Sequence, residues 1–275
     1  MKRTLILIAV LLLPLFSHGQ ECFPMLNLSK DSLVFQSGEK LTYAMHYKWG
    51  PVNSTVAKGY LTTQESDYNG TEAVKVRLYA RTSKFYNAFF KVREEFVAWL
   101  SADGLVPLHY TRDSQEGSYY ANDVYTYDWG EDPHIVATLD SKKKGQRDSL
   151  LPLDNCTFDF MSMMAHARHI NFDSLEVNKL YPMSYALGSK VKHISLICLG
   201  KETVKVDDVG KVRVWKIGLK FGSGDGFAED SDMFMYISDD ESRVPVYFAA
   251  PMKIGTVKGW LSKYEGLKKP FTAVE

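Results

Sequence analysis

Two histidines three residues apart are the first candidates for chemistry in this sequence. His166 and His169 lie in residues 158–170, which lack the alternation of a strand and are rich in Met and Ala, so a helix would place both on one face. Imidazoles bind metal ions, but the His-Glu-x-x-His pattern is absent and no carboxylate stands nearby at helical spacing. We therefore interpret the two as a surface or helix-end pair, and we predict no metal site and no cofactor.

The most polar segment could supply oxygen ligands to a calcium ion. Residues 222–232 combine four acidic side chains with three glycines. Their spacing differs from that of an EF-hand loop, and the glycines lack the arrangement of a phosphate-binding loop. The sequence therefore predicts a loop that joins two strands.

Paired carboxylates could serve in hydrolysis, and two such pairs occur. Glu94 and Glu95 are adjacent in an expected strand, where neighbouring side chains point to opposite faces, so they would not act together. Asp239 and Asp240 are typical of a turn. No serine stands in a Gly-x-Ser-x-Gly pattern. We predict no catalytic residue.

Strands must position these side chains, because most of the chain alternates polar and apolar residues. Turns rich in Gly, Asn and Asp separate the alternating segments. The predicted strands are residues 41–47, 74–80, 95–100, 108–111, 124–129, 135–139, 195–199, 212–219, 233–237, 246–248 and 256–261. The pattern predicts a mostly-β fold built as a large curved antiparallel sheet or an incomplete barrel.

One helix is predicted near residues 157–170. It would have about three turns, and Asp154 or Asn155 would cap its first turn. This helix would pack on the sheet, across the concave side. The residues that would share its packing face are Phe160, Met163, Met164 and Ala167.

Two segments of the sequence resemble each other. Residues 96–110 and residues 234–248 each contain an aromatic strand, a turn with Ser and Asp, a Val-Pro pair and a second aromatic strand. Each follows a basic and apolar strand, residues 74–80 and 212–219. Because no linker divides the chain, we favour two related halves in one continuous domain.

Aromatic residues crowd the first half of the chain. Phe85, Tyr86, Phe89 and Phe90 fall within six residues, and Trp99 follows in the next predicted strand. Core packing is the first interpretation, because aromatic side chains dominate β cores. The alternative is a cavity lined by these five residues, which would suit an apolar or glycan-like ligand.

The N-terminus has the parts of a secretory signal peptide. Lys2 and Arg3 precede an apolar run, and small residues stand at positions 17 and 19, so residues 1–19 are predicted to be removed. The mature domain, residues 20–275, has no further apolar run long enough to cross a membrane. Loss of two basic residues from 33, against 33 acidic ones, leaves a net charge near −2. Such a chain is not expected to bind nucleic acid.

Export would place three cysteines in an oxidising compartment. Cys198 lies in the apolar residues 194–199 and is predicted to be a buried thiol. Cys22 and Cys156 lie in irregular segments and are the favoured pair if a disulfide forms, a question that the sequence leaves open.

Several short motifs together resemble a bacterial family. They are the opening Gly38-Glu39-Lys40-Leu41-Thr42-Tyr43, the pair Trp49-Gly50, and the turn from Ser238-Asp239-Asp240 to Pro245. The chain resembles the exported domain of unknown function DUF 3108 over about residues 33–265. This resemblance implies an exported protein of Gram-negative bacteria with a large curved antiparallel sheet. The family brings no catalytic residues with it.

These observations predict a protein of the periplasm or cell envelope of a Gram-negative bacterium. The leading function is non-enzymatic: binding of an apolar or glycan-like ligand, or of a partner protein. One alternative is a hydrolase of envelope polysaccharide, which needs separated carboxylates that converge in a cleft. Another is a structural component of an envelope assembly, which predicts a filled barrel with an exposed apolar patch.

Overall fold

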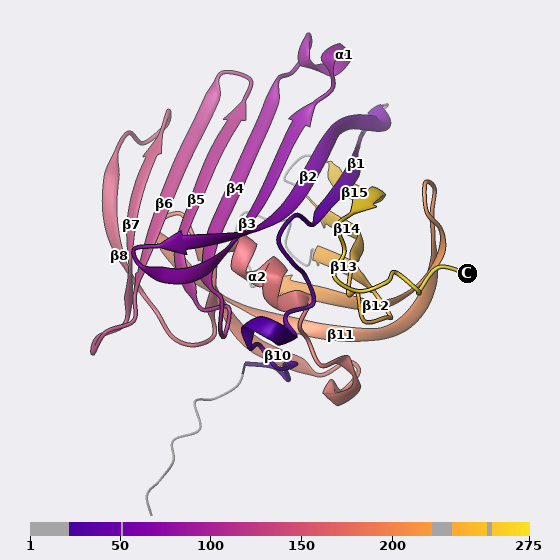
Figure 1. Ribbon diagram of the computed structural model, residues 1–275. Helices are drawn as coiled ribbons and strands as arrows, with labels where there is room; N and C mark the ends of the chain where they lie inside the picture. The colour runs from indigo at the N-terminus through magenta and orange to yellow at the C-terminus, as the bar shows by residue number, and fades with distance from the viewer. Residues whose placement is uncertain (1–21, 51, 222–232, 252–254) are drawn as a thin grey trace, which may run out of the picture.

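The computed structural model describes residues 22–50, 52–221, 233–251 and 255–275. The predicted signal peptide, residues 1–19, and the predicted loop, residues 222–232, lie outside the described residues, so both stay predictions. Fifteen strands form one large curved open sheet, which confirms the mostly-β fold (Figure 1). None of the helices in the described part of the chain is long and apolar enough to cross a membrane.

The alternation of the sequence locates most of the strands. All of the predicted strands overlap observed ones, but alternation does not predict the strands Val52–Tyr68, Arg147–Pro152, Thr157–Phe158 and Leu180–Leu187. The strands are β1 (Lys40–Trp49), β2 (Val52–Tyr68), β3 (Thr71–Thr82), β4 (Val92–Ser101), β5 (Pro107–Glu116), β6 (Tyr119–Asp128), β7 (His134–Ser141), β8 (Arg147–Pro152), β9 (Thr157–Phe158), β10 (Leu180–Leu187), β11 (Lys190–Val206), β12 (Gly210–Phe221), β13 (Met233–Ser238), β14 (Pro245–Pro251) and β15 (Thr256–Glu265). The helices are α1 (Lys84–Asn87) and α2 (Phe160–Ala167), with 3-10 turns at Lys30–Ser32 and Phe172–Ser174.

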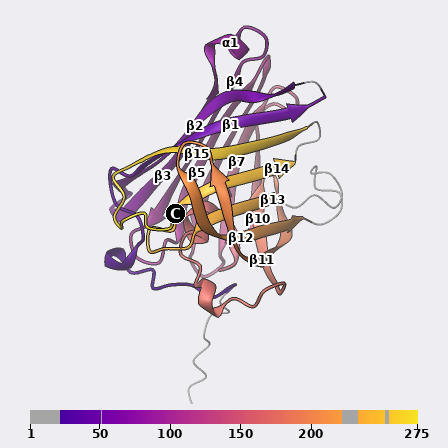
Figure 2. The same ribbon diagram turned by 90° about the vertical axis from the view of Figure 1, so that its right-hand side faces the viewer.

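Strands that are adjacent in the sheet are mostly adjacent in the chain. The order is β8-β7-β6-β5-β4-β3-β2-β1-β15-β14-β13-β12-β11-β10-β9. Two runs of antiparallel hairpins, β1–β8 and β10–β15, are therefore joined where β1 pairs with β15. The short β9 pairs in parallel with β10. Figures 1 and 2 show that the sheet curves until β11 and β12 cross the direction of β4–β6.

The two segments that resemble each other in sequence form equivalent hairpins, β4–β5 and β13–β14. In the first turn, the Ser101 N–H donates to the Val106 carbonyl at 2.8 Å, and the Ser101 hydroxyl accepts the Val106 N–H at 2.9 Å. Ser238 and Val244 make the same two bonds, at 2.9 and 2.8 Å. The residue before each valine has a left-handed backbone, with φ of 51° and 48°. This shared local structure supports the interpretation of two related halves.

The helix α2 starts later and is shorter than the sequence predicts. Asp159 caps it, because its carboxylate accepts the N–H groups of Met161 at 2.8 Å and Ser162 at 2.9 Å. The Ser162 hydroxyl in turn accepts the Asp159 N–H, which completes a capping box. The predicted cap at Asp154 or Asn155 is wrong, because residues 157–158 pair with β10 and hold the chain extended.

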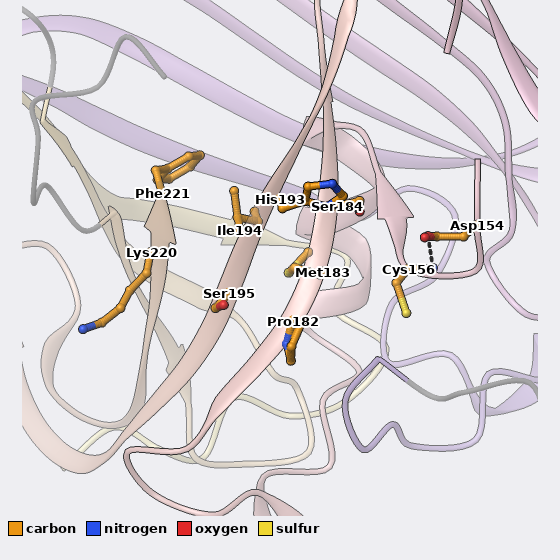
Figure 3. Close-up of a pocket in the computed structure, with 10 residues that line it drawn as sticks. All are labelled: Asp154, Cys156, Pro182, Met183, Ser184, His193, Ile194, Ser195, Lys220 and Phe221. Carbon is orange, nitrogen blue, oxygen red and sulfur yellow. Dashed lines mark hydrogen bonds between the residues drawn. The ribbon is translucent and has the colours of Figure 1, made fainter. Parts of the chain in front are cut away.

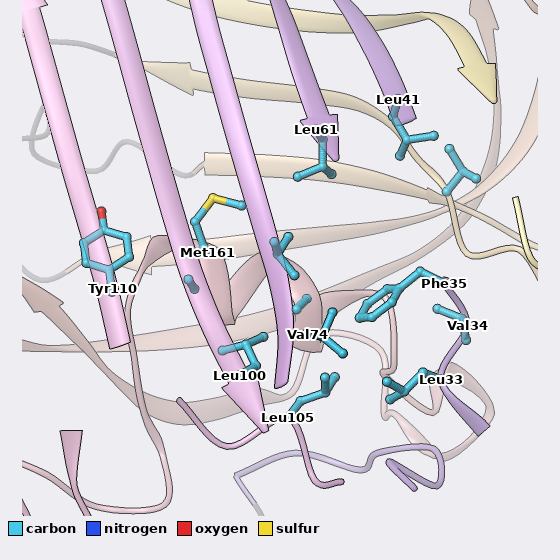
Figure 4. Packing of buried hydrophobic residues seen from close by; sticks show 14 of the residues in the cluster. Leu33, Val34, Phe35, Leu41, Leu61, Val74, Leu100, Leu105, Tyr110 and Met161 are labelled. Carbon is cyan, nitrogen blue, oxygen red and sulfur yellow. The ribbon is translucent and has the colours of Figure 1, made fainter. Parts of the chain in front are cut away.

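This helix packs on the concave side of the sheet, as predicted, but it is buried on all sides rather than on one face. Met161 and Ala165 belong to the larger of two hydrophobic clusters, and Met163 and Ala167 belong to the other. Figure 4 shows Met161 among the side chains of the larger cluster. A sheet that curves around α2 therefore leaves the helix no solvated face.

Three elements meet at a buried ion pair. Glu39, which precedes β1, and Arg168, which follows α2, are each 2% exposed. The guanidinium donates to both carboxylate oxygens of Glu39. It also donates to the carbonyls of Ser242 and Arg243 in the β13–β14 turn, both at 3.0 Å. Because the guanidinium meets a carboxylate and two carbonyl oxygens, its buried charge is well compensated.

The turn between β13 and β14 is organised by Asp240. One carboxylate oxygen accepts the hydroxyls of Ser238 at 2.8 Å and Ser242 at 2.6 Å. The other accepts the backbone N–H of Ala273 at 2.8 Å and so attaches the C-terminal segment. The interpretation of Asp239 and Asp240 as turn-forming residues fits this structure.

Candidate functional site

The aromatic residues proposed as a cavity lining lie at the tip of the β3–β4 hairpin. Phe85 and Tyr86 belong to α1, and Phe89 and Phe90 follow it. The exposed fractions of the three Phe side chains are 68%, 77% and 56%. Figure 1 shows that α1 projects beyond the neighbouring hairpins. These side chains therefore neither line a cavity nor pack in the core, because the hairpin extends past the layer that could cover them.

The tip is nevertheless held in place by specific contacts. The hydroxyls of Tyr86 and Ser54 are 2.5 Å apart, which ties α1 to β2. The ring of Phe85 contacts the rings of Tyr86 and Phe89, with centroids 5.1 and 5.5 Å apart. Tyr86 thus anchors the tip, and the phenylalanines are presented to the outside in a fixed arrangement.

Trp99 is separated from the other four predicted residues. It lies near the far end of β4, where its ring contacts Tyr68 and His109 at centroid distances of 6.2 and 5.4 Å. The Lys75 ammonium sits 4.8 Å from the centre of the Trp99 ring. This aromatic group covers the outer face of the sheet. Side chains alternate between the two faces along β4, and Phe96, an odd number of positions from Trp99, points inward to α2.

A polar cluster that the sequence does not predict lies on the inner face of β4, β5 and β6. Ser114 donates to Glu94 at 2.6 Å, and the Arg112 guanidinium lies 3.9 Å from Glu94 and 3.6 Å from Asp123. The side chains of Glu94 and Asp123 are only 15% and 10% exposed. Strand register brings them together: Glu94 faces Ser114, and Arg112 faces Asp123. No motif could reveal this, because the register is set by the whole sheet.

Tyrosines continue this cluster toward the C-terminal half. Tyr125 donates to the Gly188 carbonyl at 3.0 Å, and Tyr127 donates to Asp159 at 2.8 Å. Burial raises the pKa of both phenols, so they remain neutral donors. The network therefore links β6 to the loop after β10 and to the cap of α2.

Burial gives Glu94 an unusual acidity. Removal from water raises its pKa to about 7, although the hydrogen bond from Ser114 and the charge of Arg112 act in the opposite direction. Burial also raises the pKa of Asp123. Among the described residues, one oxygen of Glu94 and the Nε of Arg112 have no hydrogen-bond partner. Glu94 could therefore exchange a proton near neutral pH.

The two histidines are buried side chains rather than the surface pair that the sequence suggests, although they do lie at the end of α2. The His166 Nδ1 donates to the Ser162 carbonyl at 2.8 Å, and the His169 Nδ1 donates to the Ala165 carbonyl at 2.9 Å. The His169 Nε2 accepts the Val34 N–H at 3.0 Å. Burial lowers their pKa to about 4 and about 3, so both are neutral. Within the described ranges, no group of three metal-ligating side chains is assembled.

The structure joins Cys22 and Cys156 in a disulfide, the pair that the sequence favours, and leaves Cys198 as a buried thiol.

A hollow of about 590 Å³ lies beside Cys156 on the C-terminal half of the sheet (Figure 3). The Ser184 hydroxyl and the His193 Nδ1 are 3.3 Å apart there. The lining residues are Asp154, Cys156, Pro182, Met183, Ser184, His193, Ile194, Ser195, Lys220 and Phe221. The hollow mixes polar and apolar groups without a convergent set of catalytic side chains.

Comparison with known proteins supports the fold and names a family. A crystal structure of a β-barrel-like protein of the domain of unknown function DUF1849, from Brucella abortus, is similar with a TM-score of 0.56 and 10% identity. The similarity covers 84% of this chain and 98% of that one, and at this identity it concerns the fold alone. No curated protein matches the chain. The model of the family "Protein of unknown function (DUF3108)" matches residues 42–262, and the chain therefore belongs to the DUF3108 family.

Proposed function

We propose that this chain is an exported protein of the Gram-negative cell envelope that acts by binding, through the β3–β4 tip, an apolar ligand or surface. The observation that carries the proposal is the group of three Phe side chains at that tip, each more than half exposed. Burial of such side chains is favourable, so a contiguous exposed group marks an interaction site. The N-terminal sequence supports export, and the Cys22–Cys156 disulfide suits an oxidising compartment.

The inner side of the sheet is a less suitable place for an apolar ligand. The helix α2 occupies it, and all residues of α2 after Phe160 are buried. Two hydrophobic clusters pack against the helix: the larger draws residues from both halves of the sheet, and the smaller draws its strand residues from β9–β13. This packing also favours a structural component of an envelope assembly as a related function, in which the tip would meet a protein.

Hydrolysis of an envelope polysaccharide is the second candidate, and Glu94 is the observation in its favour. A carboxyl group with a pKa near 7 is what a general acid requires. Glu94 and Asp123 also converge, although on Arg112 rather than on an open cleft. Polysaccharide cleavage by the purified protein that is lost in Glu94→Gln would establish this candidate instead.

Export and binding are tested separately. Full-length protein produced in a Gram-negative host should appear in the periplasmic fraction without residues 1–19, as N-terminal sequencing would report. Native mass spectrometry of the mature protein against envelope lipids and glycans should show an adduct that is lost when Phe85, Phe89 and Phe90 are replaced by Ser. The proposal fails if no adduct forms, or if the adducts are unaffected by the triple replacement.

A further inference from the structure

We infer that the β3–β4 tip docks on an anionic lipid surface, an inference that rests on the proposed binding function and specifies its partner. The tip is part of a larger surface formed by three hairpin ends. We define the rim surface as residues 84–91, 117–120 and 142–144. These are the ends of the β3–β4, β5–β6 and β7–β8 hairpins, which Figure 1 shows side by side at the top of the sheet.

Hydrogen bonds make the rim surface continuous. The Gly117 N–H donates to the Lys91 carbonyl at 2.7 Å, which joins the second hairpin end to the first. The Lys142 ammonium donates to the Ser118 carbonyl at 2.9 Å, which joins the third to the second. The Phe90 ring also lies against Gly117, where an added Cβ would approach it to 3.1 Å. The three ends therefore present one surface rather than three independent loops.

The rim surface exposes aromatic side chains of the kind found at membrane interfaces. Besides the three phenylalanines, Tyr119 and Tyr120 are 39% and 37% exposed. Phenylalanine supplies apolar area that can enter the boundary between headgroups and acyl chains, and the tyrosine hydroxyl remains in the polar layer. A projecting tip suits a soft lipid surface, since it needs no complementary pocket.

Positive charge surrounds these aromatic side chains. The rim surface contains no acidic residue. It contains five basic ones: Lys84, Lys91, Lys142, Lys143 and Lys144. The chain as a whole has equal numbers of basic and acidic residues, so the rim surface holds a concentrated part of its positive charge. Basic side chains around an apolar tip, all exposed except the partly buried Lys91, match a surface of anionic headgroups.

The inference is tested with vesicles and the mature protein. Sedimentation with vesicles of equal parts phosphatidylcholine and phosphatidylglycerol should carry the protein down, whereas phosphatidylcholine alone should not, and added salt should weaken the binding. A basic residue near an anionic surface contributes roughly a fivefold gain in affinity, so Lys142→Gln/Lys143→Gln/Lys144→Gln should lower affinity by roughly a hundredfold. Phe85→Ser/Phe89→Ser/Phe90→Ser should also release the protein.

Matched variants outside the rim surface provide the controls. Leu150, Val177 and Leu180 are 72%, 54% and 50% exposed, so their triple replacement by Ser removes similar exposed apolar area elsewhere. Replacement of Lys205, Lys211 and Lys263 by Gln removes the same charge elsewhere. Both control variants should bind like the wild type, and circular dichroism should show that all variants are folded.

The outcomes separate this inference from the proposed function. Equal binding to neutral and anionic vesicles, with loss only in the Phe variant, would overturn the anionic partner and leave apolar binding by the tip intact. Absence of binding to any vesicle would overturn the lipid partner, and an adduct in native mass spectrometry that the Phe variant loses would then point to a soluble ligand. Binding that the control variants lose equally would overturn the assignment to the rim surface.

Discussion

Arg168 holds Glu39 in a two-pronged ion pair that is buried between β1, α2 and the β13–β14 turn. The four residues of the chain that meet there come from segments separated by more than 70 positions. Glu39 belongs to the opening motif on which the family resemblance rests. Its role is therefore structural: it fixes the start of β1 to the end of the helix.

Removal of one partner of this pair should be costly. Arg168→Ala leaves the Glu39 carboxylate buried without its counter-charge, so the free energy of unfolding should fall by about 3–5 kcal/mol. Arg168→Lys should be nearly as destabilising as Arg168→Ala, because an ammonium cannot make the bidentate contact. Glu39→Gln/Arg168→Met should lose less stability than Arg168→Ala. Urea unfolding measures all three, and a loss below about 1 kcal/mol for Arg168→Ala would contradict the compensated-charge account.

The glycine at position 259 is required by the ring of Phe248. A Cβ placed on Gly259 would lie 2.2 Å from two carbon atoms of that ring, and the two residues face each other across β14 and β15. Gly259→Ala should therefore destabilise the protein by about 1–3 kcal/mol. Gly59→Ala is the control, because its Cβ would meet the flexible Met45 side chain at 3.4 Å and the Tyr43 Cβ at 3.8 Å, both ordinary contact distances. It should change stability by less than about 1 kcal/mol.

Acid should weaken the fold through the two buried histidines. Burial lowers the pKa of His166 from 6.5 to about 4 and that of His169 from 6.5 to about 3. Below pH 6.5 the unfolded chain therefore binds more protons than the folded one. As the pH is lowered, each histidine reduces the free energy of unfolding by up to about 1.4 kcal/mol per pH unit. This contribution is complete above pH 6.5 and is lost toward the folded-state values. Urea midpoints of His169→Gln should depend less on pH between 7 and 4 than those of the wild type, and parallel curves would refute the account.

Glu94 should show the opposite dependence. Its pKa rises from 4.5 to about 7 on folding, so the folded state is favoured below pH 4.5 and loses that stability as the pH rises through 7. From pH 5 to pH 8, the free energy of unfolding of Glu94→Gln should therefore increase relative to that of the wild type by up to about 2–3 kcal/mol. The control is Glu95→Gln on the other face, whose half-exposed pair with Arg77 is worth at most about 1 kcal/mol. Thermal unfolding at pH 5 and pH 8 measures the stability of each variant relative to the wild type.

The disulfide between Cys22 and Cys156 should contribute to stability. It closes a loop with a sequence separation of 134, and constraint of so long a loop in the unfolded chain is worth about 2–5 kcal/mol. Cys22→Ser/Cys156→Ser should lower the free energy of unfolding by that amount and should unfold at a lower denaturant concentration. A reducing agent should shift the wild type to the same midpoint and leave the variant unchanged. Coincident wild-type curves with and without reductant would contradict the prediction.

The sequence by itself determined the local structure well. Polar–apolar alternation located eleven strands, since a half-buried strand needs one apolar face. The repeat of aromatic strand, Ser-containing turn and Val-Pro identified two hairpins whose turns share their hydrogen bonds. These features depend on residues close together in the chain. Alternation did not predict the strand β2, because its 17 residues include long polar stretches. It did not predict β9, because the two residues of β9 are extended only through pairing with β10.

The tertiary structure decided what lies together and what remains exposed. The register of β4, β5 and β6 set Glu94, Arg112 and Asp123 into one cluster, and no local pattern specifies a register. The sheet curved around α2, which buried the two histidines and both sides of the helix. The aromatic residues 85–90 have the composition of a core, yet the β3–β4 hairpin carries them beyond the sheet. An apolar side chain becomes core only where another layer reaches it, and that is a property of the assembled fold.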